Sequence, residues 1–107
     1  MDAVLKALAE PHRRQILRLV WNRELPSGTI ASHFDELTRA AVSLHLQVLK
    51  DAGLVEVRPE GTRRLYTARH DTVEGLRSFL DEYWTSGLER LRDVAEAAER
   101  KKRHTQN

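Results

Sequence analysis

The chain has 107 residues, a formal net charge of +2 and no cysteine, which excludes disulfides, thiolate metal sites and cysteine nucleophiles. This length suits one domain with a single core, and no apolar run approaches the roughly 20 residues needed to cross a bilayer. We therefore expect a soluble, cytoplasmic protein with no signal peptide and no membrane segment.

Charge is distributed unevenly along the chain. Residues 1–37 are neutral, residues 38–70 carry +3, residues 71–99 carry −5 and residues 100–107 carry +4. The middle and the tail are therefore basic, and the long segment between them is acidic.

The first part of the chain predicts two short helices that meet at a proline. Val4, Leu5 and Leu8 lie on one face of the first helix. Pro11 suits the first turn of the second helix, in which apolar residues recur at i, i+1, i+4 and i+5 from Ile16. The stretch "NRELPSG" then ends this second helix.

Two further helices are predicted on either side of a tight turn at "FDEL". Ser27 is expected to be the N-cap of the first, and Thr38 the N-cap of the second, which stops at Gly53. At about 100° per residue, the second helix has two opposite arcs. The inner arc, which we expect to face the core, comprises Val42, His45, Leu46 and Leu49. The outer arc, mostly small or polar, comprises Ala40, Ser43, Leu44 and Gln47.

A β-hairpin is predicted after these helices. "LVEVR" and "RLYTA" alternate apolar and polar residues, and Gly61 in "PEGT" supplies the turn. Arg58, Arg63 and Arg64 bracket the tip; arginines at a turn can also be simply solvated. A helix-turn-helix needs two short helices and a tight turn, and a basic hairpin beside it adds phosphate or minor-groove contacts. We therefore interpret helix and hairpin as one DNA-reading unit, a winged helix-turn-helix.

A single long helix is predicted from Asp71 to about Arg100, which makes the expected fold class mostly α with a small β-hairpin. Its apolar stripe has near-heptad spacing and is wider than the first 70 residues can cover, so we expect a homodimer through this helix. The residues assigned to dimerisation here are Leu76, Leu80, Tyr83, Trp84, Leu88, Leu91 and Val94. The aromatic residues of this helix either pack in the core and dimer or line a small-molecule pocket. We expect residues 1–100 to form the domain and residues 101–107 a basic, disordered tail, either solvated or bound to phosphates.

Three stretches of the chain resemble the ArsR family of bacterial dimeric repressors. "LAEPHRRQILRLV" is similar to the opening helix of that family, "AVSLHLQVLKDAGLV" to its recognition helix and following strand, and "RPEGTRRLYTA" to its wing. The resemblance covers residues 3–70 closely and residues 71–98 more loosely. It implies a winged helix-turn-helix, repression of a nearby operon, and a dimer built by the first and last helices. On the first helix, the dimer residues would be Val4, Leu5 and Leu8.

The resemblance also implies which residues contact DNA, with Ser27 at the entry of the supporting helix and most others on the recognition helix. Leu44 departs from the family pattern, because Gln or Arg often stands there and leucine makes only apolar contact, for instance with a thymine methyl. His45 has a second interpretation, packing or hydrogen bonding inside the fold, because it lies on the inner arc. The full predicted set is Ser27, Thr38, Arg39, Ala40, Ser43, Leu44, His45, Gln47, Lys50, Arg58, Arg63 and Arg64.

No metal site is predicted. Metal-sensing relatives in the family use cysteines near the supporting helix, or Asp, His and Glu sets on the last helix. This chain has no cysteine and no histidine between Val73 and Lys102, so it resembles the branch without metal sites. The five histidines match no metal-pair spacing on one helix or strand, although assembly between subunits could still bring them together. We expect no cofactor, and the effector is unknown.

Together these patterns predict a homodimeric repressor that binds an inverted repeat in double-stranded DNA and has no enzymatic activity. Ser43 and His45 are unsuited to act as nucleophile and base, because residues two apart on a helix point about 200° apart. Two alternatives stay open: a winged helix that binds proteins, and a duplex-binding protein without sequence preference. The outer arc, flanked by Arg39 and Lys50, favours DNA, since a protein-binding surface more often shows a larger aromatic patch.

Overall fold

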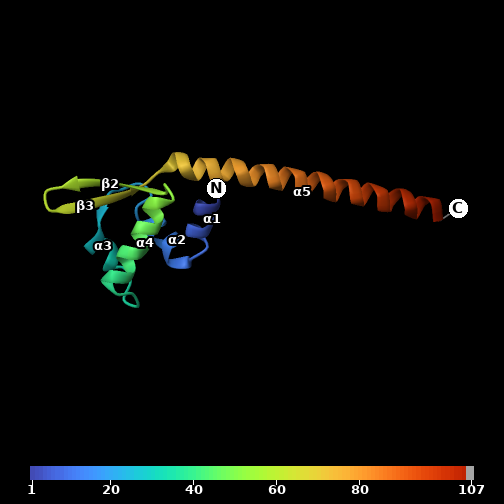
Figure 1. Ribbon diagram of the computed structural model, residues 1–107. Helices are drawn as coiled ribbons and strands as arrows, with labels where there is room; N and C mark the ends of the chain where they lie inside the picture. The colour runs from blue at the N-terminus through green and yellow to red at the C-terminus, as the bar shows by residue number, and fades with distance from the viewer. Residues whose placement is uncertain (106–107) are drawn as a thin grey trace. The chain divides into compact units, whose positions relative to one another are not determined.

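The computed structural model describes the backbone of residues 1–105 and the side chains of residues 1–101. Residues Met1–Glu74 form one compact unit and Gly75 begins a second, so each unit is described on its own. The elements in chain order (Figure 1) are α1 (Asp2–Leu8), α2 (Pro11–Leu19), β1 (Leu25–Pro26), α3 (Ser27–Ala31), α4 (Arg39–Asp51), β2 (Val55–Glu60), β3 (Arg63–Ala68) and α5 (His70–Thr105). The fold class is as predicted, mostly α with a small antiparallel sheet.

Helix α2 begins where the proline predicted it. Glu10 is the N-cap, and its carboxylate accepts a hydrogen bond from the Arg13 amide at 3.1 Å. Pro11 follows at the start of the helix, where its missing amide hydrogen leaves no helical bond unmade. The Arg13 side chain reaches back to the end of α1, where its Nε donates to the carbonyl of Ala7 at 2.7 Å. This bond ties α1 to α2.

Helices α3 and α4 form the predicted pair around a tight turn. Thr38 caps α4 as predicted, since its Oγ1 accepts a hydrogen bond from the Ala41 amide at 3.0 Å. Gly53, just beyond α4, adopts the left-handed conformation with a φ of 76°. The predicted cap of α3 was wrong: Pro26 is the N-cap, and Ser27 is already the first helical residue. The reason is that Pro26 belongs to a strand, so the backbone stays extended up to that residue.

The predicted hairpin is present and longer than expected. Strands β2 and β3 pair along all six residues of each strand, and Gly61 takes a left-handed φ of 60° in the turn. Strand β1 was not predicted; it pairs antiparallel with Leu65 and Tyr66 and makes the sheet order β1-β3-β2. A strand of two residues is too short to show an alternation of apolar and polar residues. Its pairing is therefore determined by the strand that lies beside it and not by its own sequence.

The core of the first unit is formed by α1 to α4 and the sheet. The predicted inner arc of α4 is confirmed for its apolar members, with Val42 and Leu46 each 1% exposed and Leu49 at 0%. The outer arc faces solvent, and Leu44 is 68% exposed. The buried apolar residues of the unit are Val4, Ala7, Ile16, Leu17, Val20, Ile30, Phe34, Val42, Leu46, Leu49, Leu54, Val55, Leu65 and Ala68.

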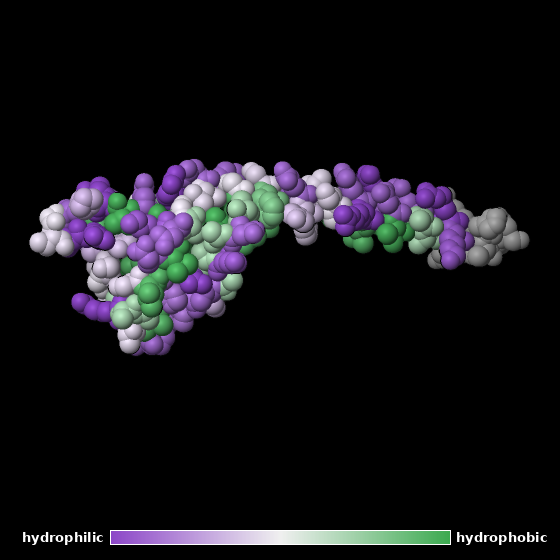
Figure 2. Space-filling view, in the orientation of Figure 1, coloured by the Kyte–Doolittle hydropathy of each residue, from purple (hydrophilic) through white to green (hydrophobic). Residues whose placement is uncertain are grey.

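Helix α5 exposes apolar side chains among charged ones, as Figure 2 shows along its length. Six large apolar residues are between 48% and 69% exposed: Leu80, Tyr83, Trp84, Leu88, Leu91 and Val94. The helix continues past residue 100 and includes residues 101–105 of the predicted tail, whereas residues 106–107 lie outside the described residues. Lysine and arginine are good helix formers, which accounts for this extension. None of the helices among the described residues has the length and apolarity of a membrane span.

Candidate nucleic-acid interface

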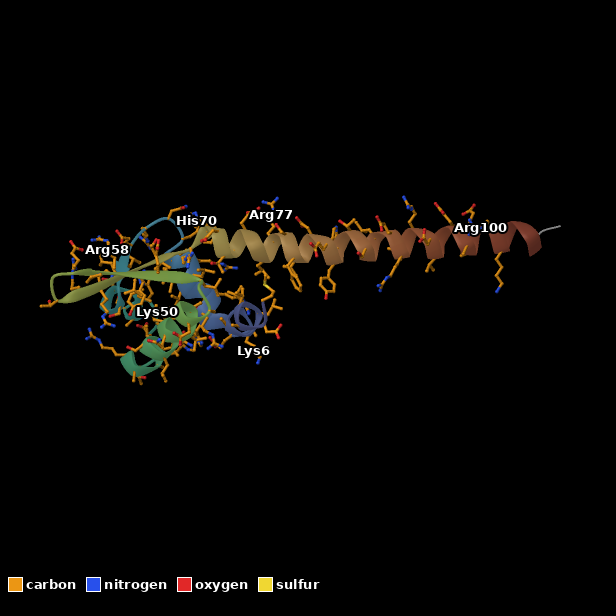
Figure 3. The ribbon with its side chains drawn as sticks, turned by 45° about the horizontal axis from the view of Figure 1, so that its top comes forward. Lys6, Lys50, Arg58, His70, Arg77 and Arg100 are labelled. Atoms are coloured by element: carbon orange, nitrogen blue, oxygen red, sulfur yellow. The ribbon has the colours of Figure 1, made fainter. Side chains whose placement is uncertain are left out.

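The outer arc of α4 and its two flanking cations are open to solvent. Arg39, Ala40, Ser43, Leu44, Gln47 and Lys50 are all exposed. The buried inner arc and the Thr38 cap hold the helix so that these side chains face outward. Within the arc, Nε2 of Gln47 donates to Oδ1 of Asp51 at 2.8 Å. Figure 3 shows Lys50 on this helix and Arg58 on the hairpin β2–β3, which we call the wing. The arc is thus a helix face of a size that the major groove of DNA admits, with a cation at each end.

A groove of about 670 Å³ lies between α3 and the wing. Small and hydroxyl-bearing residues, among them Ser27, Gly28 and Thr29, form its α3 side, and Arg63 and Arg64 form part of its wing side. The pairing of β1 with β3 places the start of α3 beside these arginines. The lining residues include no carboxylate, so this groove offers hydrogen-bond donors and positive charge suited to phosphate oxygens.

Helices α3 and α4 meet in a smaller hollow of about 170 Å³, which is lined by Ser27 and Gly28 from α3 and by Arg39 and Ser43 from α4. The Nη2 atom of Arg39 lies 3.7 Å from the position that a Cβ on Gly28 would occupy. The small side chains at the start of α3 thus leave room for the Arg39 guanidinium. The sequence predicts DNA contacts for Ser27 and Arg39 individually, and the structure places both residues in the lining of this hollow.

The three arginines of the wing are not equivalent. Arg58 forms a bidentate ion pair with Glu24, with its Nε and Nη2 atoms 2.9 and 3.0 Å from the two carboxylate oxygens. This hydrogen bonding lowers the pKa of the Glu24 carboxyl and raises the already high pKa of Arg58. Arg63 has a looser contact, with Nη2 3.6 Å from Oε2 of Glu60, and Arg64 is exposed. Arg63 and Arg64 are therefore the wing arginines more readily available to a phosphate.

His45 lies apart from the other residues predicted to contact DNA. Its side chain is 17% exposed on the inner arc, where its ring stacks on that of His12 with centroids 5.9 Å apart. Its Nε2 lies 3.9 Å from Oε2 of Glu10. Burial lowers the pKa of His45 against the attraction of the Glu10 carboxylate. The geometry supports the second interpretation of His45, a contact inside the fold, and we leave it out of the DNA-facing surface.

Glu10, His12 and His45 form one polar cluster, and contacts within it also shift the pKa values of Glu10 and His12. The hydrogen bond between Nδ1 of His12 and Oε1 of Glu10, at 2.9 Å, raises the pKa of His12. Burial raises the pKa of Glu10, but hydrogen bonds from His12 and the Arg13 amide outweigh it and leave that pKa below its usual value. His12 and His45 are far apart in sequence, so histidine spacing alone did not reveal this cluster.

Of the residues predicted to form the dimer, Val4 is buried within its own chain and the others are at least partly accessible. Val4 is 7% exposed and belongs to the core of its own chain, so it is not available to a partner. Leu5 is 39% exposed, and Leu8 lines an apolar groove of about 470 Å³ with Leu17 and Trp21. On α5 the predicted residues are exposed, apart from the half-buried Leu76.

Comparison with known proteins identifies the family of the chain. Residues 8–58 match a family described as a helix-turn-helix domain. The HTH-type transcriptional regulator Rv2034 of Mycobacterium tuberculosis is 41% identical over 87 residues, which cover 81% of this chain and 80% of that protein. A homodimeric winged helix-turn-helix DNA-binding domain from Mycobacterium bovis, Mb0332, described as a possible ArsR-family transcriptional regulator, is 36% identical with a TM-score of 0.63. That match covers 76% of this chain and 77% of the other.

The chain belongs to the ArsR family. Transcriptional repressor SdpR of Bacillus subtilis is a further relative, 31% identical over 85 residues, which cover 76% of this chain and 93% of that protein. This ArsR-family protein is therefore a DNA-binding transcriptional regulator with a winged helix-turn-helix. The family consists of regulators, not enzymes.

Proposed function

We propose that this ArsR-family regulator is a cytoplasmic, homodimeric repressor that binds an inverted-repeat operator in double-stranded DNA. The observation that carries the proposal is the continuity of its basic surface. The exposed arc of α4, with Arg39 and Lys50 at its ends, adjoins the start of α3, which in turn lines the groove with Arg63 and Arg64.

Within this surface, base reading and phosphate binding fall to different residues. Ala40, Ser43, Leu44 and Gln47 occupy the arc that would enter the major groove, so we assign base contacts to them. Leu44 is 68% exposed and has no polar atom in its side chain, so its contact would be apolar and would favour a thymine methyl. Arginine and lysine at the margins and on the wing bind phosphates, which position the protein without reading sequence.

The homodimer is supported by apolar surface that a single chain leaves open. Trp84 and Tyr83 on α5 are 69% and 68% exposed, and Leu91 and Val94 are 65% and 66% exposed. Contiguous exposed apolar surface of this kind marks a protein interface. A second copy is the occupant we propose, because a two-fold dimer presents two recognition helices to two half-sites about 10 base pairs, or a multiple, apart.

The test is selection of duplexes from a random pool by the purified protein, followed by fluorescence anisotropy on the selected and a scrambled duplex. We expect an inverted repeat, bound at least about 10³-fold more tightly than the scrambled duplex. Equal affinity for both duplexes would instead show a duplex-binding protein without sequence preference. Failure to bind any duplex would favour a winged helix that binds proteins.

A further inference from the structure

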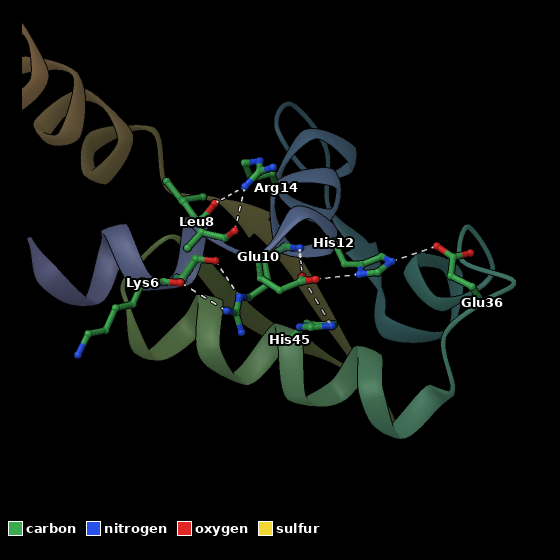
Figure 4. Close-up of polar contacts among 10 residues, drawn as sticks. Lys6, Leu8, Glu10, His12, Arg14, Glu36 and His45 are labelled. Carbon is green, nitrogen blue, oxygen red and sulfur yellow. Dashed lines mark hydrogen bonds and ion pairs between the residues drawn. The ribbon is translucent and has the colours of Figure 1, made fainter.

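A polar cluster on the inner side of α4 joins this recognition helix to the start of α2. It consists of Glu10, the N-cap of α2, His12 in the first turn of α2, and His45 on α4. All three are half-buried, and one nitrogen or oxygen atom from each lies within 4.8 Å of the other two. Figure 4 shows both imidazole rings directed toward the Glu10 carboxylate between them.

We propose that Glu10, His12 and His45 bind one divalent transition-metal ion, of the chemical class represented by Zn²⁺. Imidazole nitrogen and carboxylate oxygen are ligands that zinc prefers, and two histidines with one glutamate form a recognised three-ligand set. Magnesium and calcium bind oxygen ligands instead, so the two imidazoles select against them. Because the cluster is half-buried and not sealed, a water molecule can complete a four-coordinate site.

The distances are close to those that such an ion requires. Ligand atoms around a tetrahedral zinc ion, with bonds of about 2.0–2.1 Å, lie about 3.4 Å apart. Nδ1 of His12 and Oε1 of Glu10 are already 2.9 Å apart, and Nε2 of His45 is 3.9 Å from Oε2 of Glu10. The ligand atoms of the three residues lie up to 4.8 Å apart, so the widest separation must shrink by about 1.4 Å. Rotation of the side chains can supply this movement.

A second carboxylate supports His12 from its far side. Nε2 of His12 lies 3.2 Å from Oε1 of Glu36. With Nδ1 on the ion, Nε2 would carry the ring hydrogen and donate it to Glu36, which is the usual arrangement around a metal-bound histidine. The charges of Glu10 and Glu36 together balance a divalent ion when both imidazoles are neutral.

The cluster has a cationic neighbour, Arg13, and an aromatic one, Phe34. Arg13 is positively charged and its field acts on His45, but its Nε donates to the Ala7 carbonyl at the end of α1. The ring of Phe34 lies edge-on to His12, with centroids 5.8 Å apart, and shields one side of it. The hydrogen bonds of His12 to Glu10 and Glu36 and its contact with the Phe34 ring therefore favour a fixed orientation of the imidazole.

A bound ion would crosslink α2 to the recognition helix from the inside. Because an ion that binds only the folded chain stabilises it by mass action, the melting temperature should rise with the concentration of the ion. Amide hydrogen exchange should slow in α4 and in the first turn of α2. None of this depends on DNA, so the proposal stands or falls separately from the proposed operator binding.

The experiment titrates Zn²⁺ and Co²⁺ into the full chain after dialysis against a chelator. We expect one Zn²⁺ per chain by calorimetry and the visible absorption of four-coordinate Co²⁺. His12→Gln should abolish both signals, and Glu36→Gln should weaken binding by about 10- to 100-fold, as loss of an outer partner does. His33→Gln is the matched control, because the His33 ring bonds the Thr29 carbonyl outside the cluster and its loss should leave binding unchanged.

His45→Gln should also abolish binding, and circular dichroism will show whether that variant is folded. His12 is only half-buried, so the His12→Gln variant decides the question if His45→Gln does not fold. No Co²⁺ absorption in the wild-type chain, or full Zn²⁺ binding by His12→Gln, would overturn the proposal. Loss of binding in His33→Gln would overturn it equally, since the ion would then lie elsewhere.

Discussion

Arg58 of the wing and Glu24, which precedes β1, form a bidentate ion pair with distances of 2.9 and 3.0 Å. The pair links two points that are 34 residues apart in the chain and ties the wing to the loop before β1. Any phosphate that binds Arg58 must compete with the Glu24 carboxylate. We therefore expect Glu24 to limit DNA affinity, although it lies outside the predicted DNA-contacting surface.

We expect Glu24→Gln to tighten DNA binding. The substitution releases the Arg58 guanidinium and removes a negative charge close to the wing. Affinity should rise about two- to fivefold, the range of an exposed ion pair, on operator and scrambled duplexes alike. The slope of log affinity against log salt should become steeper by about one unit, because one more phosphate contact is made. Anisotropy titrations across a salt series measure both quantities.

Glu56→Gln is the matched control for that prediction. Glu56 is an exposed carboxylate on β2, the wing strand that carries Arg58. Its replacement by glutamine removes one negative charge, as Glu24→Gln does. If Glu56→Gln tightened binding as much as Glu24→Gln, general electrostatics rather than release of Arg58 would be the cause.

The wing and the recognition helix should differ in what they contribute. Arg63→Ala or Arg64→Ala should weaken binding to operator and scrambled duplexes equally and make the salt slope shallower by about one unit. Ser43→Ala or Leu44→Ala should cost about 1 to 3 kcal/mol on the operator, with little loss on the scrambled duplex. The assignment of roles would be wrong if the wing variants changed sequence preference and the helix variants lost affinity uniformly.

The Thr38 cap should contribute measurably to stability. Thr38→Ala removes the acceptor of the Ala41 amide hydrogen bond, so the free energy of unfolding should fall by about 0.5–2 kcal/mol. Thr38→Ser keeps the hydroxyl and should retain most of that stability. Urea unfolding followed by circular dichroism provides the measurement, and equal stability of the Ala and Ser variants would contradict a capping role.

The homodimer should depend on the apolar face of α5. Replacing Leu80 and Leu91, which are 50% and 65% exposed, by glutamate should dissociate the dimer or unfold it. Sedimentation velocity at micromolar concentration distinguishes monomer from dimer, and the wild-type chain should sediment as a dimer. Arg92→Glu, a charge change at an exposed polar position of the same helix, should leave the dimer intact. A stable, folded wild-type monomer at that concentration would refute the prediction.

Local sequence signals predicted most of the secondary structure. Pro11 and Thr38 correctly located the starts of α2 and α4, because a proline ring and a capping hydroxyl each act within one helical turn. Gly53 and Gly61 were correctly placed at a helix end and a hairpin turn, because both positions have a positive φ. Helical periodicity separated the inner arc of α4 from its outer arc for the same local reason.

The sequence by itself therefore determined the helices and the β2–β3 hairpin, the family resemblance and the outward face of α4. Only the tertiary structure decided the pairing of β1 with β3, the Arg58–Glu24 ion pair and the cluster of His12, His45 and Glu10. Each of these depends on atoms brought together from distant parts of the chain. No periodic pattern or capping signal carries that information, since such contacts follow from how packed elements are oriented and not from which elements form.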